Sequence, residues 1–339
     1  MRITRRMGAA TIATIGAALV LAACGSGTVG GSSSGSGNSG NGASGNNNKH
    51  LALVAGVDNE PFYYTMECGA KAEAQKLGYT LDFKAPAKFD AGLQNPIITA
   101  EVNDHPAGAL IVPDSDTASA APMQQLANAG TKVVEVDTSL KDSSIALSAI
   151  SSDNTEGGKL AADTLGQLVN GKSGSVLALD TIAGTSTTDQ RAQGFTDEIQ
   201  AKYPNLKVVP TEFTNNDPAV AATKVTAAIA STPDLVGIFA TNLNTGQGAA
   251  TGLANGHKAG QIQLVGFDAS PNEVTDLKAG QFQALIAQEP GTIGKDGVDQ
   301  VVNAITGKPV TKNIPTDLVS ITQANMDSNS QFFYTQTKC

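Results

Sequence analysis

The sequence predicts an α/β protein built as two doubly wound lobes, each around a parallel sheet. Beyond residue 50, short apolar runs alternate with helical patterns, which is typical of repeated strand–helix units. The chain has 339 residues, too many for one ordinary core, and it contains too many such units for one open sheet. The pattern breaks near Ser151–Asn154, where we place the change from one lobe to the other.

The start of the chain has the pattern of a secretory signal. Three arginines within residues 2–6 precede a mostly apolar stretch, Met7–Leu21, that holds no acidic residue. This stretch is shorter than the roughly 18 to 20 residues that a spanning helix needs. It ends at Leu21–Cys24, which resembles the lipobox of bacterial lipoproteins, where the cysteine is acylated. We expect a signal peptide over 1–23 and lipidation of Cys24; the alternative is a plain cleaved signal with an incidental cysteine.

The segment after the cysteine is expected to be a tether. Residues 25–49 are almost entirely Gly, Ser and Asn, a composition that cannot build a core. Removing 1–23 deletes three arginines and no acidic residue, so the formal charge changes from −9 to −12. Such a chain is repelled by nucleic acid and by anionic headgroups, so we expect no nucleic-acid partner. The sequence therefore predicts a body held by lipid at the outer face of the cell membrane, on a tether over 24–49.

Two cysteines remain if Cys24 carries lipid. Cys68 and Cys339 form an even pair in an oxidising compartment. Two free buried thiols are the alternative. A terminal residue is seldom buried, however, and an exposed free thiol is reactive, so a disulfide is favoured.

The elements follow in order from residue 51. The first helix is expected to begin after Pro61 and to end at Leu77, with Gly78 as its cap. The last long helix has Val298, Val301, Val302 and Ile305 on one apolar face and stops at Gly307. The expected strands are Leu51–Gly56, Thr80–Phe83, Gly108–Val112, Lys132–Val136, Ser175–Leu179, Lys207–Val209, Gly237–Ala240, Gln263–Phe267 and Gln283–Ala287.

Polar side chains follow many of these strands. Ligands of doubly wound sheets bind outside the carboxyl ends of the strands, so these residues are the first candidates for a binding site. Each of them also fits a simple role as the cap of the next helix. They are Asp58, Asp114, Asp137, Asp180, Asn242, Asp268 and Gln288.

One motif imitates a nucleotide-binding loop. Gly166–Ser173 matches the phosphate-loop pattern letter for letter. That loop must leave a strand and begin a helix so that backbone amides meet the phosphates. Here a helical run, Thr155–Val169, precedes the motif and an apolar strand, Val176–Leu179, follows it. We therefore exclude nucleotide binding at this motif.

Catalytic and metal-binding patterns are missing from the sequence. The three histidines, His50, His105 and His257, are scattered and have no partner at metal-ligand spacing. No Gly-x-Ser-x-Gly elbow occurs, and Asp114-x-Asp116 does not continue into a calcium loop. The sequence predicts no enzyme, no cofactor and no metal.

Four motifs in order resemble the ribose-type periplasmic sugar-binding proteins, which have the type I periplasmic binding fold. They are Asp58–Tyr63, Ser152–Gly158, the pair Ile182–Ser186 with Arg191–Phe195, and Gly266–Asp268. The similar spacing from Leu51 to about Ser320 covers nearly the whole body.

The resemblance implies two lobes joined by three hinge crossings, near Ser151–Asp153, near Gln288 and near Asp317–Leu318. It implies a first lobe over 50–152 plus 289–317 and a second over 153–288 plus 318–339. The ligand contacts that it implies are Glu60, Phe62, Tyr63, Asp137, Thr138, Arg191, Phe213, Asn242, Asp268 and Gln288. From the residues alone, Phe62 and Phe213 fit the core equally well, and Arg191 fits a solvated helix face.

Two positions depart from the family. Glu60 stands where ribose binders carry an amide, and Thr138 stands where they carry a second arginine. The chain is thus expected to bind a small neutral sugar or polyol and to deliver it, as a monomer, to an ABC permease, and another pentose, a hexose or a linear polyol fits at least as well as ribose. Carboxylates and an arginine suit vicinal hydroxyls, and aromatic faces cover C–H surfaces. The alternatives are a small amine or signalling molecule as ligand, or a sensor subunit that is not coupled to transport.

Overall fold

A computed structural model describes residues 48–339, which form the folded body of the protein. The predicted signal over 1–23, the lipidation site Cys24 and nearly all of the tether lie outside the described residues. The body has two α/β lobes, each with its own sheet, as the sequence predicted.

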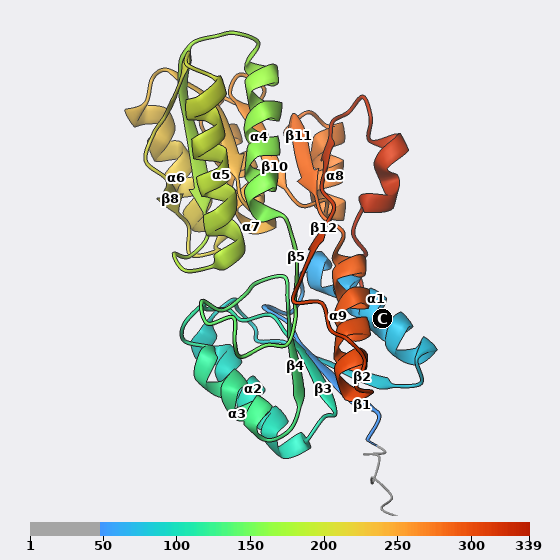
Figure 1. Ribbon diagram of the computed structural model, residues 1–339. Coiled ribbons are helices and arrows are strands. Elements are labelled where there is room, and N and C mark those ends of the chain that lie inside the picture. Colours follow the sequence, from blue (N-terminus) through green and yellow to red (C-terminus); the bar gives the residue numbers. More distant parts are fainter. Residues whose placement is uncertain (1–47) are drawn as a thin grey trace, which may run out of the picture. The chain divides into compact units, whose positions relative to one another are not determined.

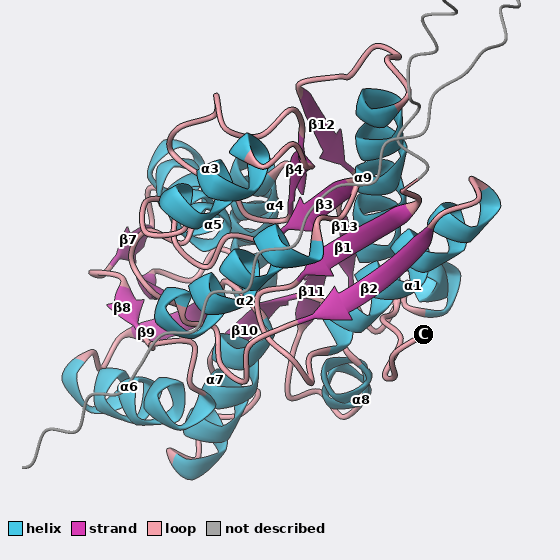
Figure 2. Ribbon diagram, turned by 90° about the horizontal axis from the view of Figure 1, so that it is seen from below, coloured by secondary structure: helices cyan, strands magenta, loops and turns pink. Residues whose placement is uncertain are grey.

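The sheet of the first lobe has six strands, all parallel, in the order β12-β5-β4-β3-β1-β2. Helices α1 and α9 pack together on one face, and α2 and α3 on the other (Figure 2). The strands are β1 (His50–Val54), β2 (Thr80–Lys84), β3 (Gly108–Ile111), β4 (Lys132–Val136), β5 (Ala149–Ser152) and β12 (Asn313–Thr316). The helices are α1 (Pro61–Lys76), α2 (Ala91–Asp104), α3 (Ala120–Asn128) and α9 (Pro290–Ile305).

The sheet of the second lobe has the order β13-β11-β10-β9-β6-β7, and β8 also pairs with β6. Only β13 runs antiparallel, against β11. The strands are β6 (Gly174–Asp180), β7 (Leu206–Val208), β8 (Glu212–Phe213), β9 (Leu235–Ala240), β10 (Gln263–Phe267), β11 (Ala284–Ala287) and β13 (Val319–Ile321). The helices are α4 (Asn154–Val169), α5 (Ser186–Lys202), α6 (Pro218–Ser231), α7 (Leu243–Asn255) and α8 (Pro271–Lys278).

Four short strands were not predicted, and each has a weak pattern for a physical reason. β12 holds Pro315 and lies at the sheet edge, where proline does not interrupt a ladder of hydrogen bonds. β5, β8 and β13 have two to four residues each, too few to show a period. The nine predicted strands all form, with ends that differ from the predicted ones by at most two residues.

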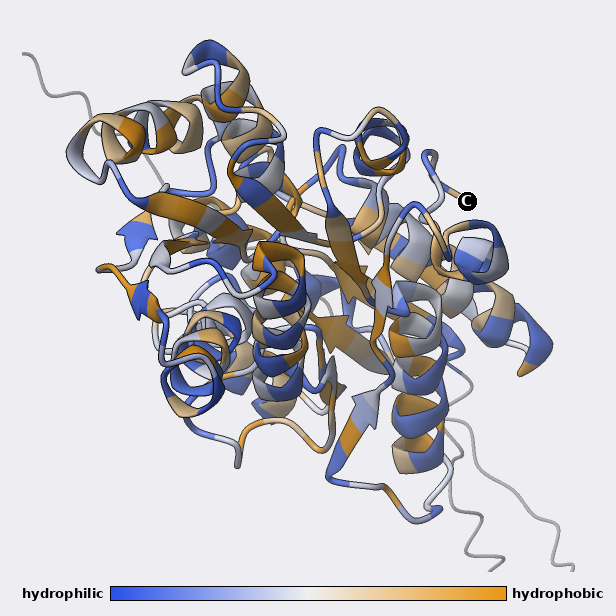
Figure 3. Cartoon of the chain, turned by 90° about the horizontal axis from the view of Figure 1, so that it is seen from above, coloured by the Kyte–Doolittle hydropathy of each residue, from blue (hydrophilic) through white to orange (hydrophobic). Residues whose placement is uncertain are grey.

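The chain passes between the two sheets three times. It leaves the first lobe after β5 at Asp153, returns after β11 at Gln288 and Glu289, and leaves again between β12 and β13 at Asp317 and Leu318 (Figure 1). These are the crossings that the sequence predicted. Strands β3, β4, β6 and β9 to β11 are buried along almost their whole length, and Figure 3 shows the strands as the hydrophobic layer. Buried strands of this kind are usual where helices cover both faces of a sheet.

The motif that imitates a phosphate-binding loop follows a helix and precedes a strand, as predicted, which is the reverse of the order that nucleotide binding needs. α4 ends at Val169, Asn170 and Gly171 both have positive φ, and β6 begins at Gly174. Among residues 48–339 no helix is both long and apolar enough to cross a bilayer. Within the same residues, no three or more His, Cys, Asp or Glu side chains cluster as a metal site.

The last residues return to the first lobe. After β13 a short 3₁₀ helix, η1 (Asp327–Phe332), packs near the second lobe, and the terminus lies beside α1 (Figure 1). There Cys339 pairs with Cys68 of α1, with Cα atoms 5.1 Å apart, a separation that suits a disulfide.

Candidate ligand-binding site

A small cavity lies where the carboxyl ends of both sheets meet. Nine of the ten predicted contact residues line it, and they come from both lobes and from the second crossing. It adjoins a larger hollow of about 970 Å³ through Glu60, Phe89 and Asn216, which line both. The lining residues are Glu60, Phe62, Tyr63, Phe89, Asp137, Thr138, Thr181, Thr185, Thr187, Thr188, Arg191, Asn216, Asn242, Asp268 and Gln288.

Backbone strain places the two facing carboxylates. Asp137 follows β4 with a φ of 65°, and Asp268 follows β10 with a φ of 97°. A non-glycine residue with positive φ costs of order 1–3 kcal/mol and is concentrated at functional sites. The strain at these two strand ends is therefore an independent sign that they belong to a binding site.

Arg191 is a fixed cation on the second-lobe side. Its Nε donates to Asn154 Oδ1 (2.8 Å), and its Nη1 and Nη2 donate to the carbonyl of Thr241 (2.9 Å) and to Gln288 Oε1 (3.1 Å). Its guanidinium lies 3.8 Å from the ring centroid of Phe267, a cation–π distance. The side chain is 2% exposed, so the alternative of a solvated helix residue is wrong.

The close approach of α4 and α5 allows Arg191 to reach the cleft. A Cβ on Gly158 of α4 would lie 2.1 Å from the carbonyl oxygen of Arg191, and one on Gly194 of α5 would lie 2.3 Å from that of Thr155. Glycine at both positions lets the helices touch through their backbones. The motif residues at these positions therefore have a packing role that supports the site.

Asp268 is held by three donors. Its Oδ1 accepts from Gln288 Nε2 (2.8 Å) and from the Tyr334 hydroxyl (2.9 Å), and its Oδ2 accepts from the backbone N–H of Leu243 (3.0 Å). Gln288 Oε1 in turn accepts from Ser152 Oγ (2.8 Å) at the first crossing. Gln288 thus links the second crossing to the first and also holds Asp268.

The first-lobe side of the cavity is bonded more sparsely. The Tyr63 hydroxyl donates to Asp137 Oδ2 (3.2 Å), and Thr138 Oγ1 donates to the carbonyl of Pro113 (2.8 Å). A Cβ on Gly56, directly after β1, would lie 2.5 Å from the Tyr63 hydroxyl and 2.7 Å from the Phe89 ring. Glycine at this position leaves the space into which these two aromatic side chains close.

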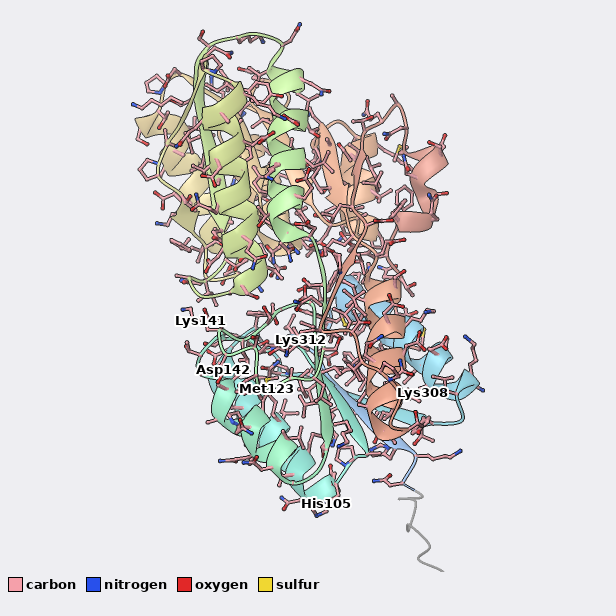
Figure 4. All side chains as sticks on the ribbon, viewed as in Figure 1. His105, Met123, Lys141, Asp142, Lys308 and Lys312 are labelled. Carbon is pink, nitrogen blue, oxygen red and sulfur yellow. A yellow bond between two sulfur atoms is a disulfide. The ribbon has the colours of Figure 1, made fainter. Side chains whose placement is uncertain are left out.

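Glu60 reaches across the mouth of the cavity. Its Oε2 accepts from Asn244 Nδ2 of α7 (3.4 Å), and the same Asn244 amide donates to Asn216 Oδ1 (3.2 Å). Nearby, the backbone N–H of Ser139 in the first lobe donates to Ser186 Oγ in the second (2.9 Å). Lys141, labelled in Figure 4, forms an ion pair with Asp116 of the first lobe. The backbone N–H of Asp116 donates to the carbonyl of Gly184 in the second lobe, which is a further contact between the lobes.

The site holds more negative than positive groups. Burial, followed by repulsion from Asp268 and Asp137, raises the pKa of Glu60 to about 8. Burial raises the pKa of Asp137 to about 7, while the positive charge of Arg191 acts in the opposite direction. Burial also lowers the pKa of Arg191, although neighbouring carboxylates counteract it. Three carboxyl groups thus share one guanidinium in a space shielded from water.

Several lining residues were not predicted. Thr181, Thr185, Thr187 and Thr188 come from the loop before α5 and its first turn, and the buried Thr185 Oγ1 has no hydrogen-bond partner among residues 48–339. Thr185 lies within the Ile182–Ser186 motif, and the other threonines lie directly before it or between it and Arg191–Phe195, which was the available signal. Phe89 and Asn216 lie on loops with no pattern, although Asn216 has a φ of 54° that only the structure reveals.

Phe213 was predicted as a ligand contact and is the one predicted residue outside the cavity. It lies on β8, is 43% exposed, and lines a separate hollow with Asp180 and Asp189. The prediction was wrong because β8 pairs with β6 at the sheet edge, which directs this part of the chain outward. The alternative of a core residue is wrong as well. Phe62, by contrast, is 3% exposed and lines the cavity.

The other strand-end candidates have local roles. Asp58 pairs with Lys338 (2.8 Å), and Asp114 accepts from the backbone of Asp90 (2.9 Å) and from Gln94 Nε2 (3.0 Å). Asn242 combines both roles, because it caps α7 through Thr245 N (3.0 Å) and lines the cavity.

Known proteins identify the family. The sequence pattern described as "Periplasmic binding protein domain" matches residues 51–309, which include the whole cavity lining. The chain belongs to this family. It is homologous to the ribose import binding protein RbsB of Salmonella typhimurium, with 31% identity over 274 residues that cover 79% of this chain and 88% of that protein. RbsB of Haemophilus influenzae is 32% identical over 80% of this chain and 91% of its own length.

Solved structures agree. A solute-binding protein of an ABC transporter from Agrobacterium vitis, bound to α-D-tagatopyranose, is 35% identical and has a TM-score of 0.81, covering 84% of this chain and 99% of that chain. One from Agrobacterium radiobacter, in complex with D-arabinose, is 26% identical and has a TM-score of 0.79, covering 84% and 98%. The chain is therefore an extracytoplasmic solute-binding protein of the ABC importer type and not an enzyme.

Proposed function

We propose that this protein is a lipid-anchored substrate-binding subunit of an ABC importer that captures a monosaccharide or small polyol by closing its two lobes and delivers it to a permease. The observation that carries the proposal is the joint cavity. Asp137 comes from the first lobe and Arg191 and Asp268 from the second, so one ligand meets all three only when the lobes are closed.

The chemistry of the lining favours a polyhydroxy ligand. Asp137 and Asp268 accept hydrogen bonds from vicinal hydroxyls, and Thr185 offers a free hydroxyl that can donate or accept. Phe62 and Phe89 supply apolar faces for the C–H surface of a sugar ring. Relatives that bind ribose, tagatose and arabinose support the same class.

Ribose is not the favoured sugar, because two lining positions carry different chemistry. Glu60 adds a buried carboxyl group, and the hydroxyl of Thr138 donates to the carbonyl of Pro113 and so has no hydrogen left to donate to a ligand. The site therefore has one guanidinium where the resemblance implies two. We expect a ligand whose hydroxyl groups are arranged differently at this end, such as another pentose, a hexose or a linear polyol.

A thermal-shift screen tests the proposal. The panel contains D-ribose, D-allose, D-tagatose, D-fucose, D-arabinose, D-apiose, linear polyols and small amines. A ligand at 100 times its dissociation constant stabilises the protein by about 2.7 kcal/mol. A shift for at least one sugar or polyol supports the proposal, and a panel in which only amines shift the melting temperature contradicts it.

An amine is the second candidate, because its positive charge can pair with the carboxyl groups of the cavity. Three carboxyl groups, those of Glu60, Asp137 and Asp268, line the cavity with one cation, Arg191. All three donor nitrogens of Arg191 already donate to protein acceptors. Glu60→Gln separates the two ligand classes at pH 7. At this pH much of Glu60 is protonated, since its pKa is about 8, so glutamine replaces one donor-bearing neutral group by another. Sugar affinity should then change by less than about threefold, whereas an amine that needs the carboxylate should lose about tenfold or more.

The anchor is a proposal from the sequence. Cys24→Ala should release the protein from the membrane fraction or stop its maturation, because the predicted acylation site is gone. Normal processing and membrane retention of this variant would overturn the lipid anchor. Uptake of the labelled sugar is compared in cells that have both this protein and its ABC permease and in cells that have the permease alone. A difference in uptake distinguishes a transport subunit from a sensor.

A further inference from the structure

The C-terminal tail contacts both lobes beside the cavity. The family pattern ends at residue 309, so the tail, here residues 327–339, lies beyond it. Tyr334 is 5% exposed, and its backbone N–H donates to the carbonyl of Ala269 in the second lobe (3.0 Å). The next residue, Thr335, donates from its N–H to Thr65 Oγ1 of α1 in the first lobe (2.6 Å). The step from one lobe to the other thus takes a single residue.

The end of the tail is fixed to the first lobe. Lys338 Nζ lies 2.8 Å from Asp58 Oδ1 and also stands over the rings of Tyr64 and Phe83. Cys339 pairs with Cys68 of α1. Three residues of the tail therefore attach to α1 or the loop before it, and the pairing of the cysteines closes the chain over a sequence separation of 271 residues.

The Tyr334 hydroxyl lies at the centre of the site's support. It donates to Asp268 Oδ1 (2.9 Å) and accepts from the backbone N–H of Gln288 (3.1 Å), so it joins the second-lobe carboxylate to the second hinge crossing. The ring packs edge-on against Phe62 of the first lobe, with centroids 5.8 Å apart. A single side chain outside the cavity lining thus touches a lining residue from each lobe and one at the crossing.

We propose that the tail is a strap, fixed by a disulfide between Cys68 and Cys339, that forms a fourth connection between the lobes, and that Tyr334 is a positioning residue for Asp268 and Gln288. The strap itself stands on the contacts of the tail, while the effect on ligand rests on the proposed function. Without the strap, Asp268 keeps two donors instead of three and the crossing loses its acceptor for Gln288 N–H. The ligand-contacting groups of the second lobe then have more freedom before the lobes close, which weakens binding.

Hydrogen exchange on the ligand-free protein tests the strap without any sugar. Tyr334→Phe removes the acceptor for Gln288 N–H and keeps the ring against Phe62. Exchange of that amide should become about tenfold faster. Cys339→Ser should accelerate exchange at both Gln288 and Tyr334, because the tail is then free to leave its seat. The double variant should add little at Gln288, since both changes act on the same contact.

A matched control lies in the second lobe. Tyr203 also donates to a carboxylate, Asp163 Oδ1, at 3.0 Å, but neither residue lines the cavity. Tyr203→Phe therefore removes the same kind of bond and should leave exchange at Gln288 unchanged. Unchanged exchange at Gln288 in both Tyr334→Phe and Cys339→Ser would overturn the strap, as would two alkylatable thiols in the native protein.

Calorimetry with D-ribose and D-tagatose tests the positioning role. Tyr334→Phe should weaken sugar binding by about tenfold, and this effect should disappear in an Asp268→Asn background. An additive effect in that cycle would overturn the positioning role. If neither sugar binds the wild-type protein, the same cycle is measured with the compound that the thermal-shift screen identifies. A screen in which no sugar or polyol binds would overturn the proposed ligand class, and the exchange experiment still decides the strap.

Discussion

The two halves of the cavity differ in how firmly they are held. On the second-lobe side, Asp268 accepts three hydrogen bonds of 3.0 Å or less, and Arg191 makes three and lies on the ring of Phe267. On the first-lobe side, the carboxylate of Asp137 accepts one bond of 3.2 Å and that of Glu60 one of 3.4 Å.

The difference indicates separate tasks for the two lobes. The second lobe has a preorganised surface whose polar groups are fixed by the protein before any ligand arrives. The first lobe has acceptors with unfilled lone pairs that a ligand with many hydroxyl groups can satisfy. Substitutions on the second-lobe side should therefore affect both folding and binding, and those on the first-lobe side mainly binding.

The largest effect is expected for Arg191→Ala. The change removes the arginine hydrogen bonds to Asn154, Thr241 and Gln288, of which Gln288 Oε1 keeps the donor Ser152 Oγ. It also removes the buried cation near Asp137 and Asp268. The free energy of unfolding should fall by about 3–5 kcal/mol, and binding of the sugar found in the screen should weaken by more than tenfold. Denaturant unfolding and titration calorimetry measure the two effects.

A lysine on the same helix provides the control for Arg191. The side chain of Lys202 is about half exposed and forms ion pairs with Glu198 and Asp163, and pairs with a solvated partner contribute at most about 1 kcal/mol. Lys202→Ala should leave affinity unchanged. Equal stability losses in the two variants would contradict the view that the second-lobe side is a fixed platform.

Asp137→Asn should separate binding from folding. The carboxylate has a single side-chain bond, from Tyr63, and burial already raises its pKa to about 7. Asparagine keeps the shape but loses one acceptor for ligand hydroxyls, so sugar affinity should fall about tenfold with a melting temperature at or above that of the wild type. A large loss of stability would show that the first-lobe side is as firmly held as the second.

Glu60→Gln should change how stability depends on pH. The ordinary pKa of the carboxyl is 4.5 and the folded value is about 8, so between these values the folded state binds more protons than the unfolded state. Stability of the wild type therefore falls as pH rises through this window. The variant should be slightly more stable at pH 5 and more stable by on the order of 4 kcal/mol at pH 8. Denaturant melts of the ligand-free protein at both values test the sign, and an unchanged difference would refute it.

The sequence predicted the fold and most of the site because both follow from strand ends. Parallel strands bring their carboxyl ends to one edge, so Asp137, Asn242, Asp268 and Gln288 could be placed from the apolar runs before them. Their meeting across two sheets followed from the family resemblance. The prediction that Phe213 contacts the ligand was wrong because strand β8 has only two residues, too few to show which side chain is exposed.

Other features depended on tertiary contacts that no local pattern encodes. Phe89 lies in a loop, and its place follows from the space left by Gly56. The tail was expected to belong to the second lobe, and its pairing with Cys68 was predicted from the even cysteine count, the oxidising compartment and the exposure expected of a terminal thiol. Tyr334 contacts Asp268 and Phe62 only because the chain turns back toward the first lobe after β13. The residues after β13 show no pattern that predicts this turn.

The smallest effect is expected for Phe213→Ala, which tests the corrected boundary of the site. Phe213 is 43% exposed in a hollow apart from the cavity, whereas Phe62 is 3% exposed and lines it. Truncating Phe213 removes little buried apolar surface, so stability should change by less than about 1 kcal/mol and sugar affinity by less than twofold. Phe62→Ala, the matched variant, removes an apolar wall of the cavity and the partner of Tyr334, so affinity should fall at least tenfold. Calorimetry on the pair decides: a comparable loss in both variants would place β8 back at the ligand and contradict the outward orientation of that strand.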